Sequence, residues 1–450
     1  MEFERELAGV VREIGRAAVE FAYNQIEPEE PQELPHYLHY EAGQYRRLNR
    51  KTANRQVATP FGKITLWRHG YRYVQRDTAE PTIFPLEIQM GLVEGATPAL
   101  AGIAAKALAE AGATQEVALA RLREEHGVAW GVKKLRAVAE NVSAGMERFR
   151  REHQAQAVAL WLHQANASAG NRRPSLVVGR DGITLCTSPH SFFEVATTAT
   201  LSVYDRRGKR LGTVYLAYPP ELGQQRMTDE LTALVQEVLR QWEGPLPRLV
   251  YVTDAGANET QYYRQVLRKL RHPRTGKRLV WQWIVDYYHA SQRITTMAEA
   301  LFGATREAAT WATKMRKLLQ KPNGPFRVLH SAAAIRSRRS MSARARKEFQ
   351  TAYNYLRDRT RHMQYGDFRA LRLPIGSGVT EAACKTVFTQ RLKLSGMRWS
   401  REGAQVILNL RVTLLSGVWN SVYQALITSY NESTPRTLAP SPSDRKRQAA

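Results

Sequence analysis

Hydrophobic positions change their spacing along the chain, and each spacing predicts a different element. In residues 4–26 they recur every three or four residues, which predicts a helix with one apolar stripe that must pack against another surface. The stripe consists of Leu7, Val10, Val11, Ile14, Ala17, Ala18, Phe21 and Ala22. Pro28, Pro31 and Pro35 end this helix. In residues 57–74 polar and apolar positions alternate, which predicts a small β-hairpin.

Helical spacing returns in residues 97–151, where Gly112 and Gly127 separate three predicted helices. The second helix begins behind Thr114, a favourable N-cap residue. The basic residues of the third helix are Lys133, Lys134 and Arg136. A helix, a glycine turn and a basic helix outline a helix-turn-helix DNA reader, but any three-helix bundle with a charged outer face gives the same pattern. Both interpretations stay open, and a polar linker is expected at 166–173.

The middle of the chain alternates between strand and helix patterns. The run Ser175 to Arg180 is apolar and rich in β-branched residues, and it leads to a carboxylate, Asp181, followed by a glycine. Two more strands are predicted at 197–204 and 211–217, then a helix capped by Thr228, a strand at 248–254, a helix at 259–270 and a strand at 279–285. Three strands before the first helix, with alternation afterwards, is the element order of an RNase H-like domain.

Strand patterns disappear between about residues 303 and 373, where helices dominate. From Lys314 to Arg372 there are 16 lysines and arginines against three acids, so much of the basic excess of the chain lies here. The densest cluster contains Arg336, Arg338, Arg339, Arg344 and Arg346. Such a density favours a helical segment that binds along the phosphate backbone of a nucleic acid, although a solvated basic face would have the same composition. The polar, proline-containing residues 429–450 are expected to be disordered.

Composition supports an anionic partner. The 450 residues carry a formal net charge of +25 and a pI near 10.2, which favours nucleic acid. No apolar run reaches the roughly 18 to 20 residues that a membrane span needs, and the N-terminus lacks the pattern of a secretory signal, so we expect a soluble cytoplasmic protein without a membrane partner. Two cysteines, Cys186 and Cys384, are too few for a disulfide framework or a cysteine zinc site.

Three carboxylates are candidates for a shared site. If the first predicted strand lies beside the fourth and parallel to it, Asp181 and Asp254 meet at one sheet edge, whereas Asp286 lies one strand further out, by about 4.8 Å. Glu381, in the first turn of a helix behind a glycine-rich turn, suits the third position. Taken singly, each aspartate is more simply a cap or a turn residue. Together the three acids suit Mg²⁺ or Mn²⁺ and phosphodiester chemistry.

The C-terminal third of the chain closely resembles bacterial insertion-sequence DDE transposases related to the Mutator elements. The resemblance lies in the runs 374–385, 390–399 and 402–405, and it extends over about 174–420. It implies an RNase H-like core made of 174–303 and 374–428, interrupted by an all-α insertion at 304–373. Upstream, we expect a mainly helical DNA-binding region. It would consist of an N-terminal helical segment at 1–56, a β-hairpin region at 57–96, and a helical region with its linker at 97–173. Relatives often carry paired cysteines near that hairpin; this chain does not, so no zinc is expected.

The same resemblance implies an activity and its residues. Asp181, Asp254 and Glu381 look like the catalytic, metal-binding acids, and Asp286 to His289 looks like a further motif of the group, in which His289 would assist catalysis or form a buried structural pair. The predicted DNA contacts after the third acid are Lys385, Arg391, Lys393, Arg398 and Trp399, the last of which suits base stacking or an ordinary core position. The expected partners are transposon ends, target DNA and at least one further copy of the chain. The alternatives are a catalytically silent DNA-binding descendant and a nuclease that hydrolyses without strand transfer.

Overall fold

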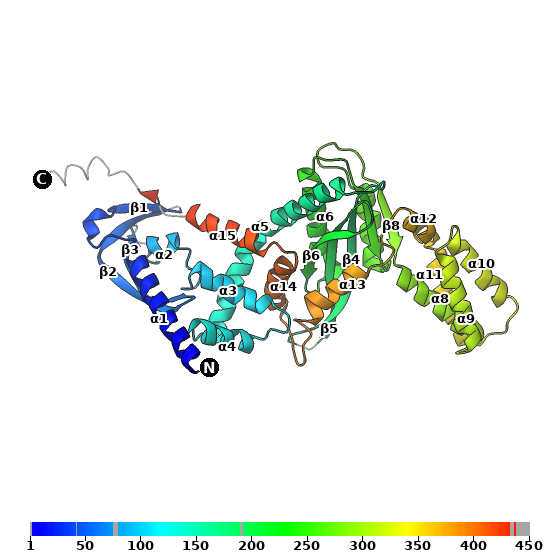
Figure 1. Cartoon of the computed structure of the whole chain (residues 1–450), viewed down its shortest axis with the longest axis horizontal. Helices are drawn as coiled ribbons and strands as arrows, with labels where there is room; N and C mark the ends of the chain where they lie inside the picture. The colour runs from blue at the N-terminus through cyan, green and yellow to red at the C-terminus, as the bar shows by residue number, and fades with distance from the viewer. Residues whose placement is uncertain (1, 42, 75–79, 190–191, 433–435, 438–450) are drawn as a thin grey trace. The chain divides into compact units, whose positions relative to one another are not determined.

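A computed structural model describes residues 2–41, 43–74, 80–189, 192–432 and 436–437 (Figure 1). It forms two compact units. The first comprises Met1–Arg150, Asn409–Leu414 and Trp419–Ala450, and the second comprises Arg151–Leu408 and Leu415–Val418. Two helices, α5 (Val132–Ala167) and α14 (Arg401–Leu415), contribute to both. Among the described helices, none combines the length and the apolar character required to cross a membrane.

The first unit contains a four-stranded sheet with the order β3-β2-β1-β9, in which all pairs are antiparallel. Its elements are α1 (Glu2–Asn24), β1 (Tyr37–Tyr40), β2 (Gly43–Thr59), β3 (Gly62–Tyr73), α2 (Pro85–Gln89), α3 (Pro98–Ala109), α4 (Gln115–His126), the start of α5, α15 (Trp419–Glu432) and β9 (Arg436–Thr437). The predicted small hairpin is therefore too short. The extra part of β2 is polar and contains register shifts between Arg47 and Lys51 and between Asn54 and Val57, so it shows no alternation in the sequence.

The three helices expected in residues 97–151 are present, with one change of length. Thr114 caps α4 as predicted, because its hydroxyl accepts the Val117 N–H at 3.2 Å, and Gly127 ends that helix with φ of 64°. The third helix does not stop near residue 151 but continues as α5 to Ala167. Its second half continues because its apolar side chains pack into the core of the second unit. These side chains include Ala155, Val158, Leu162 and Ala165.

The second unit is built on a five-stranded mixed sheet with the order β6-β5-β4-β7-β8. Its elements are β4 (Ser175–Thr187), β5 (Phe192–Tyr204), β6 (Arg210–Tyr218), α6 (Gln225–Gln241), β7 (Arg248–Thr253), α7 (Ala257–Gln265), β8 (Trp281–Val285), α8 (Tyr287–Phe302), α9 (Arg306–Leu319), α10 (Gly324–Arg336), α11 (Ala343–Arg357), α12 (Tyr365–Ala370), α13 (Gly378–Ala383), a π-helix (Cys384–Thr389) and α14. β4 pairs with β5 antiparallel and with β7 parallel, as the predicted element order requires. Figure 1 places α8 to α12 together beyond β8.

Two local predictions in the second unit are wrong. Thr228 does not cap α6, which begins at Gln225; its hydroxyl instead contacts Gln224 O at 3.1 Å and accepts a hydrogen bond from the buried Arg180 guanidinium at 3.0 Å. Asp181 does not end its strand. β4 continues to Thr187 because β5 pairs with it along its whole length, whereas the pairing with β7 ends at Gly179.

The predicted disordered tail begins too early. Residues 429–432 complete α15, and Arg436 and Thr437 form the short strand β9, which pairs with Leu38 and His39 of β1. Backbone pairing therefore orders residues whose polar composition suggested disorder. The remainder of the expected tail, 433–435 and 438–450, lies outside the described residues.

Candidate functional site

Asp181 and Asp254 come from neighbouring parallel strands and lie at the same level of the sheet. The last paired residues of β4 and β7 are Gly179 and Val252, and each aspartate stands two residues further along its strand. Burial raises the pKa of Asp181, and the negative charges of Asp254 and Glu381 raise it further, against hydrogen bonds from Gly182 and Cys384 that lower it. The three predicted acids are thus close enough to influence one another electrostatically.

The helix that carries Glu381 rests directly on the sheet beside Asp181. Gly179 makes this approach possible, because a Cβ atom there would overlap the Thr380 hydroxyl. That hydroxyl lies 2.9 Å from Thr200 Oγ1 on β5, and both groups are buried. Further along, the Cys384 thiol donates to Asp181 Oδ2 at 3.4 Å. These contacts position α13 and therefore bring the glutamate to the edge where Asp181 and Asp254 meet.

The loop that carries Asp254 is held by residues of the helical insertion. Tyr355 donates its hydroxyl to Asp254 O at 2.6 Å, and Arg359 donates to Ala255 O at 3.2 Å. Ala255 has a φ of 60°, a left-handed conformation that a non-glycine residue adopts only when its surroundings enforce it. The Asp254 carboxylate accepts the Gly256 N–H at 2.9 Å. No local pattern indicated Tyr355 or Arg359, which lie 101 and 104 residues away along the chain from the residues they hold.

Asp286 has a different environment from the other acids. It is fully buried, its Oδ1 accepts the His289 N–H at 2.8 Å, and its Oδ2 accepts the Ser377 N–H. Ser377 Oγ lies 2.9 Å from the same Oδ2 and 2.7 Å from Glu381 Oε1, so one hydroxyl proton is shared between two carboxylates. Asp286 therefore fixes the turn before α13 and, through Ser377, the carboxylate of Glu381.

One trio of side chains meets the distances of a metal site. The ligand atoms of Asp286, His289 and Glu381 lie within 4.8 Å of one another, with His289 Nε2 at 4.0 Å from Glu381 Oε1. Over the described residues, the predicted trio of Asp181, Asp254 and Glu381 does not form so tight a set. Glu381 belongs to both groups: it lies within 4.8 Å of the ligand atoms of Asp286 and His289, and its charge also raises the pKa of Asp181.

The two groups differ in how well they fit a hard cation. Asp181, Asp254 and Glu381 offer carboxylates only, the donor type that Mg²⁺ and Mn²⁺ prefer. The pKa of Asp181 is raised chiefly by burial and to a smaller extent by the charges of Asp254 and Glu381, and a bound cation would offset both effects by favouring the ionised carboxylate. In the other group both oxygens of Asp286 already accept hydrogen bonds, which leaves His289 and Glu381 as the freer donors.

A fourth acid lies beside Asp254 and was missed in the sequence. Glu259, in the first turn of α7, is only 8% exposed. Its Oε2 and Asp254 Oδ1 both lie beside Gly256, where the Cβ of any other residue would overlap the glutamate. Burial raises the pKa of Glu259, and the charges of Asp254 and Asp181 add to the effect. The available signal was its place one turn into the helix that directly follows an expected catalytic strand.

The predicted DNA contacts fall into two groups. Exposed side chains are Lys133, Arg136, Arg336, Arg338, Arg339, Arg344, Arg346, Lys385, Lys393 and Arg398, and Lys134 is half-buried. Arg391 is only 1% exposed and lies over the ring of Trp399 at 5.3 Å, which argues against the predicted phosphate contact. Trp399 is half-buried and donates its indole N–H to Leu392 O at 2.9 Å. Arg391 therefore packs against the ring of Trp399 instead of facing solvent.

A basic groove of about 1000 Å³ adjoins the Asp254 loop. Its charged lining is Arg264, Arg268, Asp358, Arg359 and Arg361, so it is strongly positive. Its wall includes three neighbouring rings, Tyr263, Trp283 and His362, which are tilted against one another, with Trp283 and His362 centroids 4.4 Å apart. Burial lowers the pKa of His362, which therefore adds no charge near neutral pH. Aromatic rings among arginines are typical of a surface that receives nucleotides.

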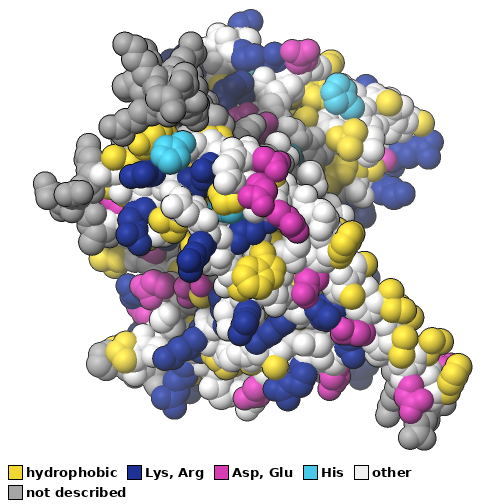
Figure 2. Space-filling view, turned by 90° about the vertical axis from the view of Figure 1, so that its left-hand side faces the viewer, with side chains coloured by type: hydrophobic (Ala, Val, Ile, Leu, Met, Phe, Trp, Pro, Cys, Tyr) yellow, Lys and Arg dark blue, Asp and Glu magenta, His cyan; other side chains and the backbone are white. Residues whose placement is uncertain are grey.

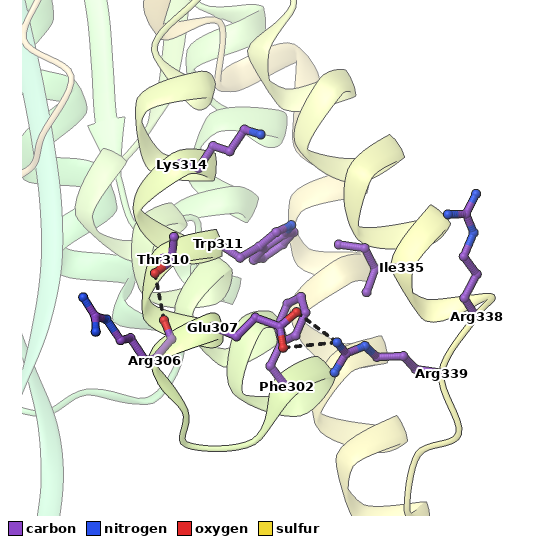
Figure 3. Close-up of a pocket in the computed structure, with 9 residues that line it drawn as sticks. All are labelled: Phe302, Arg306, Glu307, Thr310, Trp311, Lys314, Ile335, Arg338 and Arg339. Atoms are coloured by element: carbon purple, nitrogen blue, oxygen red, sulfur yellow. Dashed lines mark hydrogen bonds and ion pairs between the residues drawn. The ribbon is translucent and has the colours of Figure 1, made fainter.

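A second cavity of about 720 Å³ lies within the insertion (Figure 3). Arg339 points across it to Glu307, at 2.9 Å, and its guanidinium covers the ring of Phe302 at 4.4 Å. Figure 3 shows Arg306 and Lys314 directed away from that ion pair. Arg339 is thus partly engaged within the protein, whereas Arg306, Lys314 and Arg338 leave a net positive rim.

Comparisons with models of known protein families and with curated proteins find no match for this chain.

Proposed function

We propose that the chain is a metal-dependent DNA transposase that cleaves phosphodiester bonds at the ends of an element and joins the 3′-OH ends to target DNA. The observation that carries the proposal is the placement of Asp181 and Asp254 at one level of neighbouring parallel strands, with the helix of Glu381 packed against the same strand edge. The order of the five strands is that expected for an RNase H-like core. The motif resemblance described above agrees with this arrangement.

The acids have two different tasks in this proposal. Asp181, Asp254 and Glu381 would hold Mg²⁺ or Mn²⁺, which when bound would activate the attacking oxygen and stabilise the leaving one. Asp286 and Ser377 orient Glu381 through the shared hydroxyl proton. His289, 4.0 Å from Glu381, is placed to contact a phosphate oxygen or to complete the coordination of an ion.

The basic surfaces would hold the DNA around this edge. The groove lined by Arg264, Arg268, Arg359 and Arg361 begins at the loop of Asp254 itself, so a strand bound there would lead directly to the acids. Arg359 also holds the loop through Ala255 O, which couples occupancy of the groove to the position of the catalytic loop. The net charge of +25 supports attraction of DNA over a Debye length of about 8 Å at physiological salt.

The decisive experiment compares Glu381→Gln with Glu402→Gln, a matched change at an exposed glutamate of α14. We expect the first variant to lose Mg²⁺-dependent nicking of end DNA by at least about 1,000-fold while its DNA affinity stays nearly unchanged. The control should cleave like the wild-type protein. Cleavage by Glu381→Gln at a similar rate would show that the third acid is wrongly assigned.

A strand-transfer assay separates transposition from hydrolysis alone. Pre-cut end DNA with a free 3′-OH is incubated with labelled target DNA and Mg²⁺. Joined donor and target molecules support a transposase, whereas repeated hydrolysis without joining indicates a nuclease. No reaction with either substrate, together with tight DNA binding, would indicate a catalytically silent DNA-binding protein.

A further inference from the structure

The N-terminal helix α1 has one docked face. Val19 and Tyr23 pack against the small core beneath β3, and Asn24 donates its side-chain amide to Thr65 O at 2.9 Å and accepts the Trp67 N–H at 2.7 Å. Arg12 donates to Glu124 O at 2.9 Å. These contacts hold the helix along the sheet of the first unit and determine which side of it faces outward.

The opposite face of α1 is apolar and exposed. Its largest side chains have exposed fractions of 73% for Phe3, 49% for Leu7, 56% for Val10, 65% for Ile14 and 69% for Phe21. Figure 2 shows hydrophobic side chains along the helix that projects at the lower right. The sequence predicted that this stripe packs against another surface, yet among the described residues of this chain nothing covers it. An uncovered stripe of this length on a helix indicates a partner.

The spacing of the stripe identifies the kind of partner. Phe3, Leu7, Val10, Ile14, Ala17 and Phe21 are separated alternately by four and three residues. This is a repeat of 3.5, and it keeps one narrow seam facing a second helix over the whole length of α1. A helix that packs on a sheet needs a broader face, and the docked side of α1 already provides that contact.

We propose that α1 forms a parallel two-stranded coiled coil with α1 of a second copy of this chain, and that this seam is a dimer interface. A two-fold axis pairs identical surfaces, so one apolar seam per chain is sufficient for the complete interface. The proposal concerns assembly only and does not depend on the proposed function.

The residues beside the seam determine its direction. One flank carries Glu6, Glu13 and Glu20 at seven-residue intervals, of which Glu13 and Glu20 pair with Arg16 within the helix, and the other carries Glu4, Val11 and Ala18. In an antiparallel pair the glutamate flanks of the two helices would face each other, and like charges repel. In a parallel pair each glutamate flank faces the apolar flank of the partner, and the glutamate stems cover it. The parallel direction therefore involves less repulsion, because Arg16 offsets the charge of Glu13 and Glu20 only in part.

Light scattering after gel filtration of the full-length protein, without DNA, tests the interface. We expect the mass of a dimer for the wild-type protein, and at least about tenfold weaker self-association for the double variant Val10→Lys, Ile14→Lys. Both positions are exposed, so the circular dichroism spectrum of the folded variant should match that of the wild-type protein. Val117→Lys is the matched control, because Val117 is 57% exposed on α4, outside the seam. A wild-type monomer, an unaffected double variant, or equal loss in the control would overturn the proposal.

Single cysteines at the two ends of the seam test its direction. In a parallel pair Phe3→Cys and Phe21→Cys each lie opposite their own copy, so both variants should form disulfide-linked dimers under mild oxidation, well above the wild-type background from Cys186 and Cys384. In an antiparallel pair residue 3 lies opposite residue 21, so neither variant alone would cross-link. Absence of cross-linking in both variants would therefore overturn the parallel arrangement, even if a dimer is found by mass.

Discussion

The loops after β7 and β8 begin with the same residue type in equivalent positions, but their environments differ. Asp254 directly follows β7 and Asp286 directly follows β8, and the preceding residues Thr253 and Val285 are paired across the sheet. Asp254 is half-buried and its carboxylate accepts the Gly256 N–H, whereas Asp286 is fully buried and accepts donors on both oxygens.

Under the proposed function, this difference separates an acid that is free to hold a ligand from one that positions its neighbours. The end of a parallel strand brings an aspartate to the edge of the sheet in both cases. At β8 the backbone N–H and the hydroxyl of Ser377, in the turn before α13, donate to the carboxylate of Asp286, so this residue has a structural task. At β7 the loop is held through its backbone by Tyr355 and Arg359, so the carboxylate of Asp254 remains available for a ligand.

The largest effect is expected for Asp254→Asn. It should reduce Mg²⁺-dependent cleavage by more than about 1,000-fold, because a carboxylate ligand is lost while the shape is kept. The melting temperature should stay near that of the wild-type protein. Asp229→Asn, at an exposed position of α6, is the matched control in both assays. Near-normal cleavage by Asp254→Asn would show that Asp254 is not a metal ligand, and it would contradict the proposed difference between Asp254 and Asp286.

Asp286→Ala should affect stability first and activity second. Several hydrogen bonds to a buried carboxylate are lost, so we expect about 3 kcal/mol less free energy of unfolding of the second unit. Chemical denaturation followed by fluorescence measures this change.

The milder variant Ser377→Ala separates positioning from stability. It keeps Asp286 but removes the hydroxyl that orients Glu381, so cleavage should fall about 10- to 100-fold and the Mg²⁺ concentration for half-maximal activity should rise. A purely structural role would leave that concentration unchanged, and such a result would contradict the positioning role.

The smallest effect concerns the protonation of Asp181. Its pKa is raised chiefly by burial, so the ionised form is less favourable in the folded than in the unfolded chain. The stability that this residue contributes in its protonated form is present at low pH and is lost as pH rises through its folded-state pKa. Without metal at neutral pH, Asp181→Asn should therefore melt above the wild-type protein, and the difference should shrink as the pH falls.

Added Mg²⁺ provides the complementary measurement. It should raise the melting temperature of the wild-type protein, in which it relieves the repulsion among the acids, and have little effect on Asp181→Asn. An Asp181→Asn variant that melts at or below the wild-type temperature at neutral pH would show that ionised Asp181 does not destabilise the folded protein.

Much of the second unit could be predicted because its elements have strong local patterns. The apolar faces of α6 and the strands and the parallel neighbours β4 and β7 follow from spacing, and in the first unit the cap at Thr114 follows from the chemistry of a single residue. The polar part of β2 could not be predicted, because its partner strand rather than its own pattern orders it. Thr228 was misassigned as a cap for a related reason: the buried guanidinium of Arg180 binds its hydroxyl.

The sequence by itself determined the order of the strands and helices, the basic surface, and the acids that reach one edge of the sheet, because periodicity, charge and motif spacing are local properties of a chain. Only the tertiary structure decided that Asp286 accepts hydrogen bonds from Ser377 and that Glu259 lies beside Asp254. It also decided that Arg391 is buried and that the apolar stripe of α1 faces outward. These properties depend on which distant residue approaches each group, and burial and hydrogen bonding exist only once those approaches are made.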